Sequence, residues 1–222
     1  MKAIIFDLDG TLIDSAPDIH AASAVVLKAE GLPPLPFEQV RGFIGNGVGV
    51  LISRVIAASG VEETPELHAR MSRRFYDIYE SAVNLTELYP GVPALLERLQ
   101  KRGFRLGVCT NKPIEATRAV LGHFDLLGRF DMLVGGECLP VKKPDPAPLQ
   151  HTVRSLGATN ILYVGDSEVD AETARAAGLD FALFTPGYRK APVESLPHVL
   201  AFDHYDQLGR YIDKRFGVVE PT

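Results

Sequence analysis

Three aspartates follow apolar runs in the sequence, at points where a buried strand would end. Asp7 and Asp9 come directly after Ala3–Phe6, and Asp166 comes shortly after Ile161–Val164. Carboxylates that share one crevice raise one another's pKa, so their cluster is unfavourable without a cation. Carboxylate oxygens with no neighbouring His or Cys favour Mg²⁺ over Zn²⁺. The sequence therefore predicts a Mg²⁺ site on Asp7, Asp9 and Asp166.

A lysine and a second strand end complete a set of residues suited to binding a phosphate group. Lys143 lies in Lys142–Pro146, where prolines stiffen the chain and can hold its ammonium group against the acids. Together with Mg²⁺, this ammonium group would offset the three carboxylates, so that a dianionic phosphate could bind. Thr110 and the backbone N–H of Asn111 follow the run Leu106–Cys109, and we expect them to bind the phosphoryl oxygens.

The same acids could carry out covalent phosphoryl transfer. Asp7 is the candidate nucleophile, because a carboxylate is ionised at pH 7 and needs no base. Asp9 would protonate the leaving alkoxide and then take a proton from the water that cleaves the phosphoaspartate. A lone general base accelerates a reaction by only about 10²–10⁴-fold, whereas enzymes accelerate phosphomonoester hydrolysis by up to ~10²¹-fold. Positioning, a metal ion and covalent catalysis must therefore act together.

Alternating apolar runs and helical stretches predict the scaffold that holds these residues. The expected strands are Ala3–Phe6, Leu106–Cys109, Met132–Val134, Ile161–Val164 and Phe181–Phe184. The expected helices around the later strands are Pro90–Arg102, Glu115–Leu121, Ala147–Leu156 and Glu168–Ala177. Apolar runs without polar alternation are typical of parallel strands that are covered on both faces. We therefore predict an α/β fold with a doubly wound, Rossmann-like parallel sheet, whose strand ends meet at one edge.

The stretch between Ser15 and Leu88 shows helical periodicity and no clear strand. Its first helix is expected to start with Ser15 as the N-cap, Pro17 in the first turn and Asp18 at position N3, and to run to about Glu30. The further helices expected here are Phe37–Phe43, Val48–Ser59 and Pro65–Ala82. This pattern predicts an α-helical cap domain inserted after the first strand.

These elements divide the chain into two parts. We expect a catalytic core of residues 1–15 and 86–222 and a helical cap domain of residues 16–85, joined by hinges at 14–16 and 88–91. One continuous domain with extra helices is the alternative. Phe202–Phe216 is expected to form a packing helix, and Gly187–Leu200 carries no recognisable pattern.

Composition excludes several classes of protein. The chain has 222 residues and a net charge of −5, which gives no general attraction to nucleic acid or to anionic membranes. The N-terminal apolar run is too short for a signal peptide or a membrane span. The two cysteines, Cys109 and Cys138, form no CxxC motif, which fits a reducing compartment. We expect a cytoplasmic monomer or homodimer that binds a small-molecule phosphate ester.

Four segments, in order, resemble the motifs of the haloacid dehalogenase superfamily. They are Asp7-Leu-Asp-Gly-Thr, the strand end at Thr110, Lys143-Pro, and Gly165-Asp-(three residues)-Asp170. The resemblance implies Asp7 as nucleophile, Asp9 as acid and base, and Lys143 as stabilising cation. It also implies Mg²⁺ on the Asp7 side chain, the Asp9 backbone carbonyl and Asp166. Asp170 is implied to be an acid that lies behind the metal ligands or that orients the lysine.

Further segments are similar to the bacterial phosphoglycolate phosphatases of this superfamily, which implies 2-phosphoglycolate as substrate. They are Asp14-Ser-Ala-Pro-Asp-Ile, Ile44-Gly-Asn-Gly and Thr110-Asn-Lys-Pro. The residues expected to contact substrate are Gly10, Thr11, Asn111, Lys112, Gly45 and Asn46. His20, Arg41 and Arg54 of the cap could face the substrate, but packing or solvated positions are the simpler reading.

Other functions remain open for these motifs. A phosphatase for another small phosphate, such as a sugar phosphate, would share the core residues and differ in the cap. A phosphomutase is disfavoured because related mutases place a His where this chain has Ile19, and a dehalogenase because Asp9 is present. A non-catalytic binding protein on this fold would have lost Asp7, Asp9, Lys143 or Asp166, and all four are present.

Overall fold

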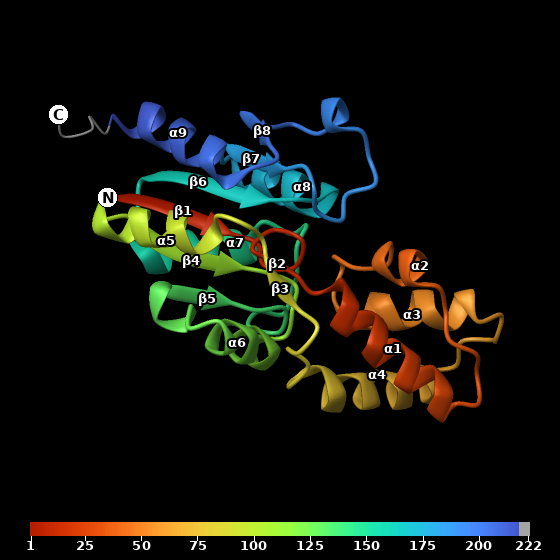
Figure 1. Ribbon diagram of the computed structural model, residues 1–222. Helices are drawn as coiled ribbons and strands as arrows, with labels where there is room; N and C mark the ends of the chain where they lie inside the picture. Colours follow the sequence, from red (N-terminus) through yellow and green to blue (C-terminus); the bar gives the residue numbers. More distant parts are fainter. Residues whose placement is uncertain (218–222) are drawn as a thin grey trace.

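The computed structural model describes residues 1–217 and contains a parallel sheet, helices on both of its faces, and a group of four helices beside one end of the sheet (Figure 1). The strand order is β5-β4-β1-β6-β7-β8, and every neighbouring pair is parallel. These strands are β1 (Lys2–Phe6), β4 (Arg105–Cys109), β5 (Met132–Val134), β6 (Asn160–Gly165), β7 (Phe181–Phe184) and β8 (Leu200–Phe202). The predicted α/β fold with a doubly wound sheet is confirmed.

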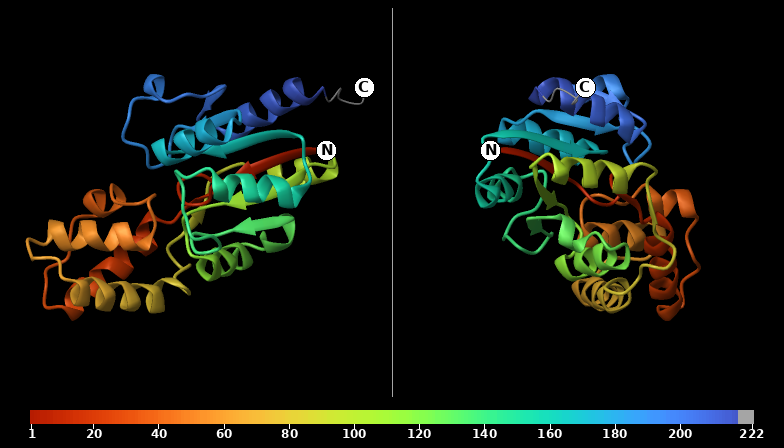
Figure 2. Two further views of the ribbon diagram at one scale, coloured as in Figure 1. Left: turned by 180° about the vertical axis from the view of Figure 1, so that it is seen from behind. Right: turned by 60° about the vertical axis from the view of Figure 1, so that its left-hand side comes forward.

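The central strand, β1, shows why the sheet is buried on both faces. Ile4 and Phe6 pack in one apolar cluster, and Ala3 and Ile5 pack in the cluster on the opposite face. Helices α5 (Val92–Lys101), α6 (Ile114–His123) and α9 (Tyr205–Phe216) cover the first face, and α7 (Ala147–Leu156) and α8 (Glu168–Ala177) cover the second (Figure 2). Strand β1 therefore needs apolar residues at consecutive positions.

Strand β1 also lies at the topological switch point. The chain goes from β1 to β4 and β5 on one side, and returns to β6 on the other side of β1. In open parallel sheets, ligands bind in the crevice beyond the strand ends at such a point. The ends of β4, β1 and β6 are therefore the natural position for a site.

The four helices beside the sheet share their own apolar cluster, which includes Val26, Ile52 and Phe75. They are α1 (Ala16–Ala29), α2 (Phe37–Arg41), α3 (Val48–Ala58) and α4 (Pro65–Tyr79). Two short segments, β2 (Ile13–Asp14) and β3 (Glu87–Leu88), pair antiparallel and carry the chain into and out of this group. We call α1–α4 the four-helix group. None of the helices within residues 1–217 combines the length and apolar character needed to cross a bilayer.

The C-terminal part differs from the prediction. The sequence predicts that the last helix includes Phe202, but Phe202 ends strand β8, and α9 starts at Tyr205 after His204. The Phe202 ring packs 5.3 Å from that of Phe184 and 5.5 Å from that of Tyr205, between centroids. A three-residue strand shows no period of its own, so the helical spacing of its aromatic residue was misleading. Two short 3₁₀ turns, Leu127–Arg129 and Val193–Ser195, were also not predicted.

The start of α1 lies where the sequence predicts it, with Ser15 as the N-cap residue and Pro17 and Asp18 in the first turn, but the expected capping hydrogen bond is not formed. Instead, Ser15 Oγ donates to Asp9 Oδ1 over 2.6 Å. Asp18 accepts hydrogen bonds from Leu85 N at 3.0 Å and from Thr86 Oγ1 at 2.6 Å, and so ties α1 to the chain that returns to the sheet. The capping residues therefore serve tertiary contacts.

Candidate active site

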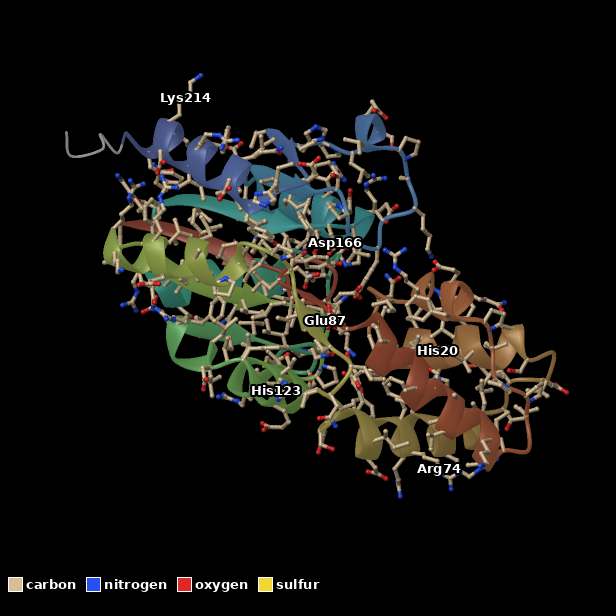
Figure 3. The ribbon with its side chains drawn as sticks, viewed as in Figure 1. His20, Arg74, Glu87, His123, Asp166 and Lys214 are labelled. Carbon is tan, nitrogen blue, oxygen red and sulfur yellow. The ribbon has the colours of Figure 1, made fainter. Side chains whose placement is uncertain are left out.

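The ends of three central strands bring the predicted residues together. Asp7 follows β1, Thr110 and Asn111 follow β4, and Asp166 follows β6. The backbone N–H of Asp7 donates to the carbonyl of Val164 over 2.8 Å, which extends the β1–β6 ladder to the nucleophile candidate. Figure 3 shows Asp166 at the end of the sheet that faces the four-helix group.

Lys143 is buried between two carboxylates. Its Nζ lies 2.9 Å from Asp7 Oδ1 and 2.6 Å from Asp170 Oδ1. It also donates to the hydroxyl of Tyr163 over 2.9 Å, and that hydroxyl donates to Asp170 Oδ1 over 2.8 Å. An ammonium group with three partners of this kind is fixed in place, so its positive charge stays beside Asp7.

Asp170 also organises the loop that carries Asp166. It occupies position N3 of α8 and forms a capping box with Ser167. Its Oδ2 accepts from Ser167 Oγ at 2.6 Å and from the backbone N–H of Asp166 at 3.2 Å. One carboxylate therefore holds both the lysine and the turn after β6.

Asp166 is closely surrounded, so that Gly10 and Gly187 next to it have no space for a side chain. Thr11 Oγ1 donates to its Oδ1 over 2.8 Å, and the backbone N–H of Tyr188 donates to its Oδ2 over 2.6 Å. A Cβ on Gly10 would lie 2.5 Å from Oδ2, and Gly10 has a φ of +85°, which favours glycine. A Cβ on Gly187 would lie 2.2 Å from the Cβ of Asp166. Thr11 and Gly10 thus position Asp166.

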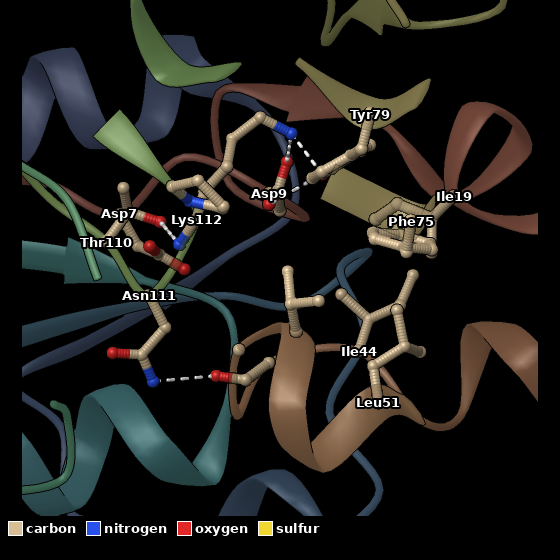
Figure 4. Close-up of a pocket in the computed structure, with 14 residues that line it drawn as sticks. Asp7, Asp9, Ile19, Ile44, Leu51, Phe75, Tyr79, Thr110, Asn111 and Lys112 are labelled. Carbon is tan, nitrogen blue, oxygen red and sulfur yellow. Dashed lines mark hydrogen bonds and ion pairs between the residues drawn. The ribbon is translucent and has the colours of Figure 1, made fainter. Parts of the chain in front are cut away.

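Asp9 lies apart from this cluster and has its own cation. Lys112 Nζ lies 3.0 Å from Asp9 Oδ1, and it also donates to the hydroxyl of Tyr79 (Figure 4). The Tyr79 hydroxyl donates to Asp9 Oδ2 over a long 3.5 Å. Tyr79 is the last residue of α4, so the four-helix group reaches directly to the predicted acid and base.

Asn111 joins the site to the four-helix group through its amide. The side-chain Nδ2 donates to the carbonyls of Gly45 and Lys143, both over 3.0 Å, and Oδ1 accepts from Lys143 N over 3.0 Å. The amide therefore fixes the backbone of Lys143. It also holds the loop before α3 against the end of β4.

The buried acids are short of positive charge. Asp7, Asp166 and Asp170 each offer an oxygen within 4.8 Å of the other two, and Lys143 is the ammonium group paired with Asp7 and Asp170. Burial raises the pKa of Asp7 to about 7; the charge of Asp170 adds to this rise, and Lys143 opposes it. Burial also raises the pKa of Asp166, with Asp170 and Asp7 adding to it. Burial would raise the pKa of Asp170 too, but Lys143 holds it below its ordinary value.

This donor set fits a hard divalent cation. Three carboxylates against one ammonium group leave two negative charges, and the available donors are oxygens. Asp7 Oδ1 is buried and makes no well-aligned hydrogen bond, although Lys143 lies beside it. Asp170 already holds the ammonium group of Lys143, whereas Asp166 accepts from two uncharged groups, the Thr11 hydroxyl and the Tyr188 N–H. Asp7 and Asp166 are therefore the side chains better suited to bind a metal.

A cavity of about 40 Å³ lies over Asp7 and Asp9. Its core side is polar and its other side, from the four-helix group, is mostly apolar (Figure 4). The lining residues from the core are Asp7, Asp9, Thr110, Asn111, Lys112 and Pro113. Those from residues 16–85 are Ile19, Ile44, Gly45, Gly47, Val48, Leu51, Phe75 and Tyr79. The cavity is small, which favours a short substrate.

Gly10 and Thr11, which were expected to contact substrate, do not line this cavity and lie against Asp166 instead. Four residues between 16 and 85 that were considered from the sequence also lie outside it. Asn46 Oδ1 accepts from Arg54 over 3.0 Å, and Arg54 also donates to the carbonyl of Phe43. The His20 ring contacts the carbonyl of Leu35 at 2.9 Å. Arg41 donates to the carbonyl of Gly187 over 3.0 Å and stacks over the Tyr188 ring. Of the two predicted loop contacts, Gly45 lines the cavity and Asn46 does not.

Three tyrosines of the site were not predicted. Tyr163 lies within an apolar strand, where a buried hydroxyl needs a partner, and that is the one signal the sequence offers. Tyr188 lies in the segment without a pattern; its hydroxyl accepts from Ser15 N and donates to Asp14 over 2.7 Å. Tyr79 lies at the end of an amphipathic helix, where its spacing indicates only packing.

Comparison with known proteins identifies the class. The model of the "Haloacid dehalogenase-like hydrolase" family matches residues 4–184. The chain therefore belongs to the haloacid dehalogenase-like hydrolases, as the order of its motifs predicts. Within that family it is a phosphatase, similar over almost its whole length to bacterial phosphoglycolate phosphatases.

The similarity covers both the sequence and the fold. Phosphoglycolate phosphatase of Cereibacter sphaeroides (strain ATCC 17025) is 54% identical over 94% of this chain and 96% of its own length. That of Rhodobacter capsulatus is 41% identical over 93% of this chain and 94% of its own length. The crystal structure of a predicted phosphoglycolate phosphatase from Haemophilus somnus 129pt has a TM-score of 0.90 and 33% identity, covering 95% and 97% of the two chains.

Proposed function

We propose that this chain is a Mg²⁺-dependent phosphomonoester hydrolase that converts 2-phosphoglycolate to glycolate and phosphate. The observation that carries the proposal is the position of Asp7, which lies at the floor of a small cavity beside buried Lys143. In this proposal, residues 16–85 act as a cap that closes over the cavity and excludes water from the reaction.

Asp7 and Asp9 divide the chemistry between them. One Asp7 carboxylate oxygen attacks phosphorus, and the ester P–O bond breaks to leave a phosphoaspartate and an alkoxide. Asp9 gives its proton to that alkoxide, and later removes one from the water that attacks phosphorus, which frees phosphate and Asp7. Lys143 and Thr110 stabilise the charge on the phosphoryl oxygens during both steps.

Mg²⁺ would be held by the side chains of Asp7 and Asp166 and by the backbone carbonyl of Asp9. When bound, it would supply Lewis-acid stabilisation of the charge on the transferring phosphoryl group. Thr11, Gly10 and the N–H of Tyr188 keep Asp166 in place for this task. The sequence leads us to expect a cytoplasmic protein, which would take its metal from that compartment.

Three features support 2-phosphoglycolate as the substrate. The two curated relatives described above are named phosphoglycolate phosphatases, and they match this chain over at least 93% of its length. The cavity is small, about 40 Å³, and the side chains from residues 16–85 that line it are mostly apolar, so they offer few partners to the hydroxyl groups of a sugar. Lys112 offers positive charge at the cavity wall for a substrate with a second negative group.

A panel of small phosphate esters tests this function. We expect the highest kcat/KM for 2-phosphoglycolate, with sugar phosphates at least about tenfold lower, since one missing or extra contact of about 1.4 kcal/mol gives that factor. Excess EDTA should remove activity toward every ester, and added Mg²⁺ should restore it. An unselective profile would rule out a dedicated 2-phosphoglycolate enzyme, and full activity in EDTA would rule out the metal.

Gly187→Ala should disturb the proposed metal site. The new Cβ would lie 2.2 Å from the Cβ and 2.3 Å from Oδ2 of Asp166, so this carboxylate must move. A displacement of about 1 Å can cost about 10²-fold in rate, and we expect a loss of that order. The concentration of Mg²⁺ needed for half-maximal activity should rise as well.

Gly122→Ala is the matched control, since a Cβ on Gly122 of α6 meets nothing within 4 Å. It should leave both the rate and the Mg²⁺ titration as in the unaltered protein. If Gly187→Ala showed the same Mg²⁺ titration as this control, the close approach of Gly187 would not be what positions Asp166.

A further inference from the structure

Tyr79 is a polar group in an otherwise apolar wall. Among the cavity-lining residues from 16–85, its hydroxyl is the only polar side-chain group; the others are aliphatic, phenyl or glycine. The residue is buried, and its ring packs 5.0 Å from that of Phe75 between centroids. A buried hydroxyl at this place needs polar partners, and the structure provides them from the core.

The partners of Tyr79 are the residues of the core that face the cavity. Its hydroxyl accepts from Lys112 Nζ, which also lies 4.0 Å from the ring centroid. Lys112 is the one cation among the lining residues, because Lys143 is held between Asp7 and Asp170 behind them. An ammonium group has three N–H donors, and Asp9 and Tyr79 occupy two of them.

We propose that Tyr79 is a specificity-determining residue, which together with Lys112 binds the carboxylate of the substrate. This inference rests on the proposed function and adds the group that recognises the end of the substrate opposite the phosphate. Lys112 has a third N–H donor for a carboxylate in the cavity, and the Tyr79 O–H, whose bond to Asp9 Oδ2 is a long 3.5 Å, can rotate to donate to the same carboxylate. Because Tyr79 comes from α4, this binding site is complete only when the cap lies against the core.

The apolar wall sets the length of the substrate. Ile44, Leu51 and Phe75 line the cavity beside Tyr79, and they offer no hydrogen bonds to sugar hydroxyls. Asp7 and the Lys112–Tyr79 pair line the same small cavity, of about 40 Å³, which favours a short substrate over a longer one. A longer polyol would have to bury hydroxyl groups against these side chains without partners.

The test compares two esters that differ in the carboxylate. For the unaltered protein and for Tyr79→Phe, kcat and KM are measured with 2-phosphoglycolate and with ethyl phosphate. Tyr79→Phe keeps the ring against Phe75 and removes only the hydroxyl. In Tyr79→Phe, we expect the ratio of kcat/KM for 2-phosphoglycolate to kcat/KM for ethyl phosphate to fall about tenfold or more, because a hydrogen bond to a charged group is lost. Most of the change should be in KM for the acid.

Tyr76→Phe is the matched control, because Tyr76 lies on the same helix and does not line the cavity. Calorimetric affinities for 2-phosphoglycolate and for inorganic phosphate, measured in an Asp7→Asn background, separate binding from chemistry. Adding Tyr79→Phe should weaken binding of the acid about tenfold, and binding of inorganic phosphate by much less.

The outcomes separate the inference from the proposed function. If Tyr79→Phe lowers activity toward both esters equally, or if Tyr76→Phe has the same effect on the ratio, Tyr79 does not read the carboxylate, while the phosphatase chemistry stands. If the unaltered protein hydrolyses neither ester and binds no phosphate, the proposed function fails and the inference fails with it.

Discussion

Asp7→Asn should lower kcat for every phosphate ester by on the order of 10⁴-fold or more, since an enzyme that loses its nucleophile loses the covalent route as a whole. The amide has nearly the shape of the carboxylate but does not attack phosphorus. Burial already disfavours the charge of Asp7, as its raised pKa of about 7 reflects. The substitution should therefore leave the melting temperature in metal-free buffer unchanged or higher.

Two measurements make this prediction sharp. Rapid acid quench and intact-mass analysis during turnover should detect a phosphorylated protein for the unaltered chain and none for Asp7→Asn. Asp77→Asn, on the exposed side of α4, is the matched control and should behave like the unaltered chain. Activity that survived the change at Asp7 would remove the covalent mechanism, whatever the remaining residues do.

Lys143→Met should reduce both activity and stability. It removes the ammonium group that lies 2.9 Å from Asp7 and 2.6 Å from Asp170, while an apolar stem of similar length stays in place. Removing one partner of a buried ion pair costs about 3–5 kcal/mol, because an unpaired charge remains. Loss of one electrostatic contact to the transition state costs about 10²–10³-fold in kcat, and we expect at least that. Urea unfolding and initial rates measure the two effects.

The loss of stability should depend on pH. In the unaltered chain Lys143 depresses the pKa of Asp170, and a depressed pKa contributes stability above the unfolded value that is lost as pH falls through the folded one. Without Lys143, burial favours the protonated form of Asp170. The difference in unfolding free energy between the two proteins should therefore be larger at pH 8 than at pH 4.

A second substitution separates structure from catalysis. Asp170→Asn added to Lys143→Met removes one of the two carboxylates that lose their ammonium partner, so part of the lost stability should return while activity stays low. Lys101→Met, at an exposed position of α5, is the control for removal of a lysine. A double variant as unstable as Lys143→Met would show that the unpaired Asp170 carboxylate is not a source of the loss.

The sequence predicts those parts of the fold that depend on residues close together along the chain. The five predicted strands are apolar runs of the right length, and β1, β4, β5, β6 and β7 lie where these runs occur. Polar residues at the ends of β1, β4 and β6 meet because parallel strands place their carboxyl ends at one edge. Such arguments reach Asp7, Thr110 and Asp166 without any contact being known.

The parts that escaped prediction depend on contacts between distant segments. Ser15 is of a residue type that commonly caps helices, yet its hydroxyl donates a hydrogen bond to Asp9, because the turn after β1 brings the two together. Nothing near Tyr79 in the sequence indicates that its hydroxyl meets Lys112. Tyr188 follows a glycine that must approach Asp166 closely, and that requirement becomes visible only once β6 and β7 lie side by side.

The antiparallel pairing of β2 with β3 has an evolutionary consequence. Ile13 lies opposite Leu88 and Asp14 opposite Glu87, so the chain departs and returns at neighbouring points. Because each doubling of an insert's length adds only about 0.6 kcal/mol of closure entropy, inserts of very different size can be tolerated there. Evolution can therefore replace the whole insert, and with it the substrate specificity, while the sheet that positions the catalytic residues stays unchanged.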